Sequence, residues 1–159
     1  MDEETKKVLE ELFGPPDLIE QFIGLLKARD VSIEKHEHGI RTKYFLATKV
    51  DRSVVVLAHE STKDGWWGIG ADLISRVNKV AEDPKFGLGS WGAALIDQKP
   101  SRGYWVPGEA ISELHGIGLV TLDSQGKYHF HRPILEAQTE LVHSFASIEK
   151  FLKLAGLES

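Results

Sequence analysis

The sequence predicts an α/β fold built on a mixed sheet, and three observations lead to this prediction. The run Val54 to Leu57 is apolar on both faces, which is typical of a central strand covered by helices. A second apolar run of this kind ends at Asp97. Between them, residues 71–82 show the spacing of an amphipathic helix, a segment long enough to connect two parallel strands.

Length and composition are those of one globular domain. The 159 residues are 42% apolar and 27% charged, so we expect a single packed domain over residues 1–159. The chain has no cysteine, which excludes disulfides, thiolate zinc sites and cysteine nucleophiles. The acidic start Met1 to Glu4 and the lack of an apolar run of roughly 20 residues lead us to expect a cytoplasmic protein without a membrane span.

The first elements predicted are helices. Residues 3–13 suit a short acidic helix, and residues 17–29 suit a longer helix that faces the core. Asp17 and Glu20 have the spacing of a capping box, with Asp17 as the N-cap. Apolar residues then follow on one broad stripe, which predicts burial of that face.

A change of period after residue 31 predicts strands. Residues 31–36 alternate between apolar and polar, Gly39 permits a tight turn, and residues 41–49 are rich in β-branched and aromatic side chains. We therefore predict an antiparallel hairpin, followed by the central strand 53–58. The segment 60–70 is interpreted as a loop.

The remaining predicted elements include a helix-hairpin-helix extension at the C-terminal end. In chain order they are the helix 71–82, the strand 91–97, a loop to Gly108, a short helix ending at Gly116, a hairpin turning at 123–126, and C-terminal helices including 147–155.

Two segments resemble copies of one another, 38 residues apart. The strand 53–57 leads to Gly65-Trp66-Trp67, and the strand 92–96 leads to Gly103-Tyr104-Trp105. A right-handed crossover would make the two strands parallel, so that both aromatic loops meet at one edge of the sheet, where ligands of α/β folds bind. The candidate ligand-binding residues at this edge are His59, Glu60, Lys63, Trp66, Trp67, Asp97, Lys99, Arg102, Tyr104 and Trp105.

The α-β-β-β-α-β order over roughly residues 17–99 resembles the core of the restriction-endonuclease-like, or PD-(D/E)XK, nuclease superfamily. The resemblance implies metal-dependent phosphodiester cleavage, with acidic side chains holding a divalent cation such as Mg²⁺ and a lysine stabilising charge. Members carry an acidic-x-Lys element on a central strand. The corresponding strand here has Leu57 and His59 at those positions, so the pattern is absent there.

Asp97-Gln98-Lys99 satisfies the acidic-x-Lys pattern at the end of the next strand, and Glu60 is expected at the neighbouring strand end. Glu60, Asp97 and Lys99 are therefore the candidate catalytic residues of a rearranged site, with Glu60 and Asp97 as metal ligands. The alternative is a solvated strand end with a surface salt bridge, because about two such triplets are expected by composition alone.

The aromatic and histidine patterns also have two interpretations each. Trp66-Trp67 and Tyr104-Trp105 suit either core residues or a platform that stacks on bases, with Arg102 or Lys63 on phosphate. The pairs His36/His38 and His129/His131 suit either a zinc site that lacks an identified third ligand or ordinary half-exposed strands.

The functional expectation is a nucleic-acid-associated protein with a degenerate nuclease-like fold, more a binding protein than an enzyme. If it is an enzyme, the resemblance implies a metal-dependent nuclease. We expect no cofactor, the alternative being a divalent cation, and no nucleotide cofactor because no phosphate-binding loop occurs. The net charge of −5 counts against nucleic acid. The alternative function is a regulatory protein-interaction module that uses exposed aromatic loops or the C-terminal helix, including for self-association.

Overall fold

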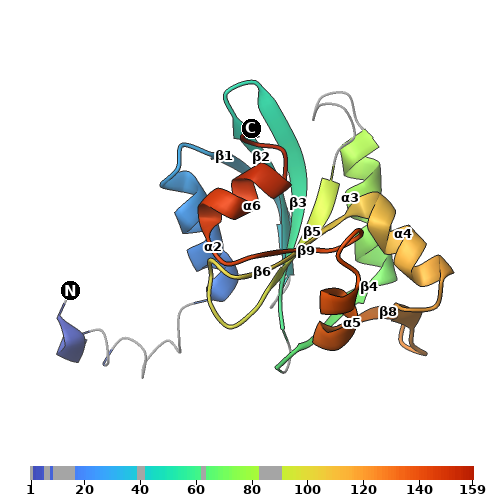
Figure 1. Ribbon diagram of the computed structural model, residues 1–159. Helices are drawn as coiled ribbons and strands as arrows, with labels where there is room; N and C mark the ends of the chain where they lie inside the picture. Colours follow the sequence, from blue (N-terminus) through green and yellow to red (C-terminus); the bar gives the residue numbers. More distant parts are fainter. Residues whose placement is uncertain (1, 6–7, 9–16, 39–41, 62–63, 83–90) are drawn as a thin grey trace.

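The computed structural model describes residues 2–5, 8, 17–38, 42–61, 64–82 and 91–159, without the side chains of 35–38. A six-stranded mixed sheet forms its centre, in the order β1-β2-β3-β5-β6-β9 (Figure 1). The strands of this sheet are β1 (Ser32–His38), β2 (Thr42–Lys49), β3 (Arg52–Glu60), β5 (Trp91–Ile96), β6 (Gly103–Pro107) and β9 (His143–Phe145).

The two predicted central strands are adjacent and parallel, as expected. β3 pairs with β5 from Val55↔Trp91 to Glu60↔Ile96, while every other neighbouring pair in the sheet is antiparallel. Side chains 54–58 of β3 are fully or almost fully buried on both faces, which explains the continuous apolar run. The crossover between these strands includes the predicted helix, α3 (Ala71–Glu82).

Helices cover both faces of the sheet (Figure 1). One face carries α2 (Leu18–Lys27) and α6 (Ile148–Leu154), and the other carries α3 and α4 (Gly108–Gly116). The alternation of side chains along β3 divides the core accordingly, with Val54, Val56 and Ala58 in one apolar cluster and Val55 and Leu57 in the other.

The predicted α2 helix is confirmed, including its N-cap. The Asp17 carboxylate accepts a hydrogen bond from the Ile19 backbone N–H at 2.8 Å. Glu20 forms an ion pair with Lys43 on β2. Of the predicted helix 3–13, residues 3–5 and 8 are helical and the others lie outside the described residues. No helix in the described ranges is both long and apolar enough to cross a membrane.

Two segments interpreted as loops are strands. β4 (Trp66–Gly70) belongs to a small second sheet with the order β4-β8-β7, and β6 adds to the main sheet beside β5. The glycines around the aromatic pairs suggested loops, but the chain uses them for close packing: a Cβ on Gly103 would lie 2.1 Å from the Leu95 carbonyl oxygen. The repeat is thus β-β-α rather than βα.

The C-terminal part contains the predicted helix and hairpin and also two elements that the sequence analysis did not specify. The hairpin consists of β7 (Thr121–Leu122) and β8 (Lys127–His131). The additional elements are α5 (Arg132–Ala137) and β9, which pairs with β6 at the edge of the main sheet. The C-terminal segment is therefore part of the main core and not a separate extension.

Candidate functional site

The carboxyl ends of β3 and β5 lie side by side, which creates the sheet edge where the sequence places its candidate residues. In the parallel register His59 is next to Leu95 and Glu60 is next to Ile96. Asp97 follows directly after β5. Glu60 and Asp97 therefore lie at nearly the same level, at the ends of two neighbouring strands.

The two carboxylates nevertheless face opposite sides of the sheet. Side chains two residues apart on a strand point to the same face, so Glu60 faces the same side as Ala58. Ile96, which pairs with Glu60 on the neighbouring strand, and Ala58 both belong to the cluster under α2 and α6. The Asp97 side chain instead binds Arg132 of α5, on the opposite face. Within the described residues, no group of three His, Asp or Glu side chains is placed to hold a metal ion.

His59 also lies on the face opposite Glu60. It is buried, and its Nδ1 is in hydrogen-bond contact with the Thr42 hydroxyl across the β2–β3 register. The ring is thereby anchored at the sheet edge beneath the second core cluster. This contact gives His59 a structural role in joining β2 to β3.

Asp97 is the centre of a small network of charges. Its side chain is 1% exposed, and its Oδ1 accepts a hydrogen bond from Arg132 Nη2 at 2.7 Å. Its Oδ2 makes no hydrogen bond within the described part of the chain, and Arg102 Nε lies 4.0 Å away. Arg132 compensates the cost of burying this carboxylate, since an unpaired buried charge is strongly unfavourable.

Arg132 also binds Asp64, which precedes β4. Its Nη2 donates to Asp64 Oδ1 at 2.8 Å, and Gln98 Nε2 donates to the same oxygen at 2.6 Å. The hydrogen bond from Arg132 holds the pKa of Asp64 below its ordinary value. Hydrogen bonds to Asp64 and Asp97 in turn raise the pKa of the Arg132 guanidinium, which therefore carries a permanent positive charge.

The turn from Asp97 to Arg102 presents Lys99 and Arg102 outward. The Lys99 backbone N–H donates to the Asp97 carbonyl at 2.8 Å, and the Arg102 backbone N–H donates to the Lys99 carbonyl at 3.1 Å. Gln98 has a φ of 66°, a conformation that costs energy for a residue other than glycine. Its hydrogen bond to Asp64 stabilises this conformation.

A cavity of about 910 Å³ opens beside this turn. It is lined by Asp97, Lys99, Ser101, Arg102, Gly103, Tyr104, Glu136, Ser144, Phe145, Ala146, Ser147 and Lys150. Three of these residues are basic and two are acidic. Both acidic side chains have a protein partner, because Asp97 Oδ1 binds Arg132 and Glu136 accepts a hydrogen bond from the Tyr104 hydroxyl at 2.9 Å. Lys99 and Lys150 are thus available to a ligand that enters the cavity, and Arg102 lies beside Asp97 Oδ2 at 4.0 Å.

Tyr104 holds its proton tightly at the wall of this cavity. The side chain is 5% exposed, and burial, together with its hydrogen bond to Glu136, raises the pKa of Tyr104 to about 12. The phenol is therefore a neutral hydrogen-bond donor at ordinary pH. It has no role as a base there.

Trp67 and Trp105 are core residues and not a stacking platform. Trp67 is 0% exposed and donates from Nε1 to the Ile96 carbonyl at 3.1 Å. Trp105 is 3% exposed and packs edge-on against Phe151 of α6. Its ring also covers Gly92, where an added Cβ would lie 2.4 Å from the indole. Of the two interpretations of the aromatic pattern, both residues therefore agree with the one that places them in the core.

Trp66, His129 and His131 are not among the residues that line the cavity. Trp66 is partly exposed on the small sheet and packs against His129, with a ring-centroid distance of 4.8 Å. His129 Nε2 lies 2.6 Å from Asp123 Oδ2, and its ring stacks at 6.3 Å with that of His131. Lys63 and the side chains of His36 and His38 lie outside the described part of the structure.

The structure thus brings together Asp97, Lys99, Arg102 and Tyr104 from the predicted set. It adds Asp64, Arg132, Glu136 and Lys150, which no local motif in the sequence identifies. Comparisons with protein-family models, with curated proteins and with solved structures found no match. A function for this chain must therefore be inferred from the chemistry of the site.

Proposed function

We propose that the chain binds the phosphate groups of nucleic acid in the Asp97 cavity without cleaving them. The observation that carries this proposal is the set of three basic side chains, Lys99, Arg102 and Lys150, around a cavity lined by two acidic side chains, Asp97 and Glu136, that bind Arg132 and Tyr104. Guanidinium and ammonium groups bind phosphate through charge-assisted hydrogen bonds. The hydroxyls of Ser101, Ser144 and Ser147 add further donors at the same wall.

A binding role without catalysis agrees with the arrangement of the acidic groups. Metal-dependent cleavage needs carboxylates that converge on a cation. Here Asp97 is paired with Arg132, and Glu60 belongs to the other face of the sheet. The order α2-β1-β2-β3 and, after the small-sheet strand β4, α3 and β5, supports a degenerate nuclease-like ancestry.

We do not propose the protein-interaction alternative. It needs exposed aromatic side chains or a free C-terminal helix, and Trp67 and Trp105 are buried in the core. The helix α6 packs its apolar residues, among them Phe151 and Leu152, into the cluster beneath the sheet. Of the aromatic residues that this alternative would use, Trp66 is partly exposed, on the small sheet.

The test is fluorescence anisotropy with labelled single-stranded DNA, single-stranded RNA and duplex DNA at low ionic strength. The double variant Lys99→Ala/Arg102→Ala should weaken binding about tenfold or more and reduce the salt dependence, because each lost phosphate contact removes a released counterion. The matched control is Lys79→Ala/Lys153→Ala, which removes the same charge from exposed positions on α3 and α6. Equal losses in both double variants would mean that only net charge matters, and the proposal would be wrong.

A further inference from the structure

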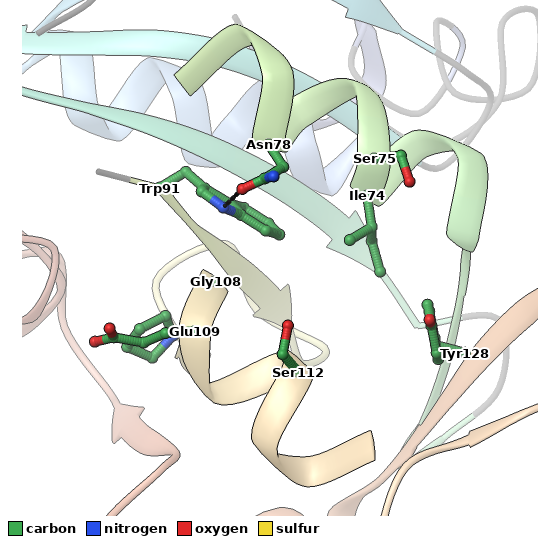
Figure 2. A pocket seen from close by; sticks show the side chains of 9 residues that line it. Ile74, Ser75, Asn78, Trp91, Gly108, Glu109, Ser112 and Tyr128 are labelled. Carbon is green, nitrogen blue, oxygen red and sulfur yellow. Dashed lines mark hydrogen bonds between the residues drawn. The ribbon is translucent and has the colours of Figure 1, made fainter. Parts of the chain in front are cut away.

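A second cavity, of about 530 Å³, lies in the space between α3 and α4 (Figure 2). Its walls come from α3, α4, the start of β5 and the strand β8. The lining includes Ile74, Asn78, Trp91, Glu109, Ser112 and Tyr128.

Trp91 forms a fixed aromatic wall of this cavity. Although it begins a central strand, its side chain is only partly buried. Its Nε1 donates a hydrogen bond to Asn78 Oδ1 at 3.1 Å, which ties the indole to α3 (Figure 2). On the other side it lies directly against Gly108, where an added Cβ would be 2.3 Å from the indole nitrogen. A flat ligand would meet an aromatic surface that is already in position.

The rest of the lining provides apolar contact and hydroxyl groups. In Figure 2 the Ile74 side chain and the Ser112 hydroxyl both point into the space between the two helices, and Tyr128 lies at one end of it. A hydroxyl both donates and accepts hydrogen bonds, so it suits the ring nitrogens and carbonyls of a heterocycle. Among the described residues that line the cavity, Glu109 is the single charged one, and it disfavours an anion there.

We propose that this pocket binds a flat, uncharged nitrogen heterocycle, namely a nucleobase or nucleoside without phosphate, stacked on Trp91. Its volume lies in the range of small-molecule sites, roughly 300–1,000 Å³. Stacking of a base on an aromatic side chain is favourable for every base because each has a π face. The proposal depends on residues that the Asp97 cavity does not use.

The probe is adenosine, followed by tryptophan fluorescence and by isothermal calorimetry. We expect saturable binding to the wild-type chain, with a fluorescence change that is lost in Trp91→Phe. Ser112→Phe places a ring in the pocket from an exposed helix position and should weaken adenosine binding about tenfold. Ser124→Phe makes the same change at an exposed turn outside the pocket and should leave binding unchanged.

A second comparison tests the chemistry of the ligand. Adenosine monophosphate should bind about threefold more weakly than adenosine, and Glu109→Gln should remove the difference. The proposal is overturned if adenosine shows no saturable binding, if Ser112→Phe binds it like the wild type, or if the monophosphate binds as well as the nucleoside. None of these results affects the Lys99/Arg102 experiment, so the two proposals fail separately.

Discussion

Arg132 Nη2 lies 2.7 Å from Asp97 Oδ1, and this contact joins α5 to the end of the central strand β5 across 35 residues of sequence. The Asp97 side chain is 1% exposed, so its charge has little access to water. The pair therefore determines the charge at this wall of the cavity. Breaking the pair should lower the free energy of unfolding.

Removing Arg132 should be strongly destabilising. Arg132→Ala leaves a buried carboxylate without its main partner, and we expect a loss of about 3–5 kcal/mol in the free energy of unfolding, measured by urea denaturation. The double variant Arg132→Ala/Asp97→Ala should lose less than Arg132→Ala alone, because it leaves no buried charge. A single variant within about 0.5 kcal/mol of wild type would contradict this account.

Stability should depend on Tyr104 at high pH. Its pKa is raised from 10.0 to about 12, so the native state holds this proton more tightly than the unfolded chain does. The stabilisation is complete below pH 10 and is lost as the pH rises through 12. Between these values the wild type should lose about 1–2 kcal/mol more than Tyr104→Phe, measured by denaturation at each pH. Parallel curves for the two proteins would refute the role of Tyr104.

The three tryptophans near the sheet edge should separate into two classes. Trp67→Ala and Trp105→Ala should each cost about 3–5 kcal/mol, because both side chains are buried. Trp66→Ala should cost clearly less, since Trp66 is partly exposed on the small sheet. Thermal unfolding followed by circular dichroism measures all three. A small effect at Trp67 would show that its ring is not a core residue.

The β2–β3 turn offers a stabilising substitution. Val50 is 91% exposed and has a φ of 59°, which is unfavourable for a β-branched residue. Val50→Gly should raise the free energy of unfolding by about 1 kcal/mol because glycine adopts this conformation without strain.

The reciprocal change is Gly126→Val in the β7–β8 turn. Gly126 has a φ of 78° and open space around an added Cβ, so only backbone strain opposes the substitution. It should lower the free energy of unfolding by about 1–2 kcal/mol. If both substitutions left the denaturation midpoint unchanged, strain at these turns would be negligible.

Divalent cations should leave the fold unaffected. Glu60 and Asp97 belong to opposite faces of the sheet, so they present no shared site for Mg²⁺ or Mn²⁺. We expect no rise in melting temperature with millimolar cation and no cleavage of DNA or RNA above background. A stabilisation that disappears in Asp97→Ala would restore the metal-site hypothesis.

The apolar patterns of the sequence determined the centre of the fold. The continuous apolar run of β3 reflects burial on both faces, and the helical spacing of α3 reflects burial on one, so both could be predicted from period alone. The parallel pairing of β3 with β5 followed from the connecting helix. Asp97, Lys99 and Arg102 were placed correctly at the strand end because they adjoin a predictable strand.

The partners of these residues were decided only by the tertiary structure. Arg132 neutralises Asp97, Asp64 binds Arg132, and Lys150 lines the cavity. These three residues come from separate segments, and charged residues carry no periodic signal that pairs them. Likewise, the segment around Gly103 was predicted to be a loop, whereas Gly103 permits close contact between β6 and the backbone of β5. The spacing of apolar residues predicts whether a residue is buried. The residues that it contacts are decided only when segments distant in the sequence pack together.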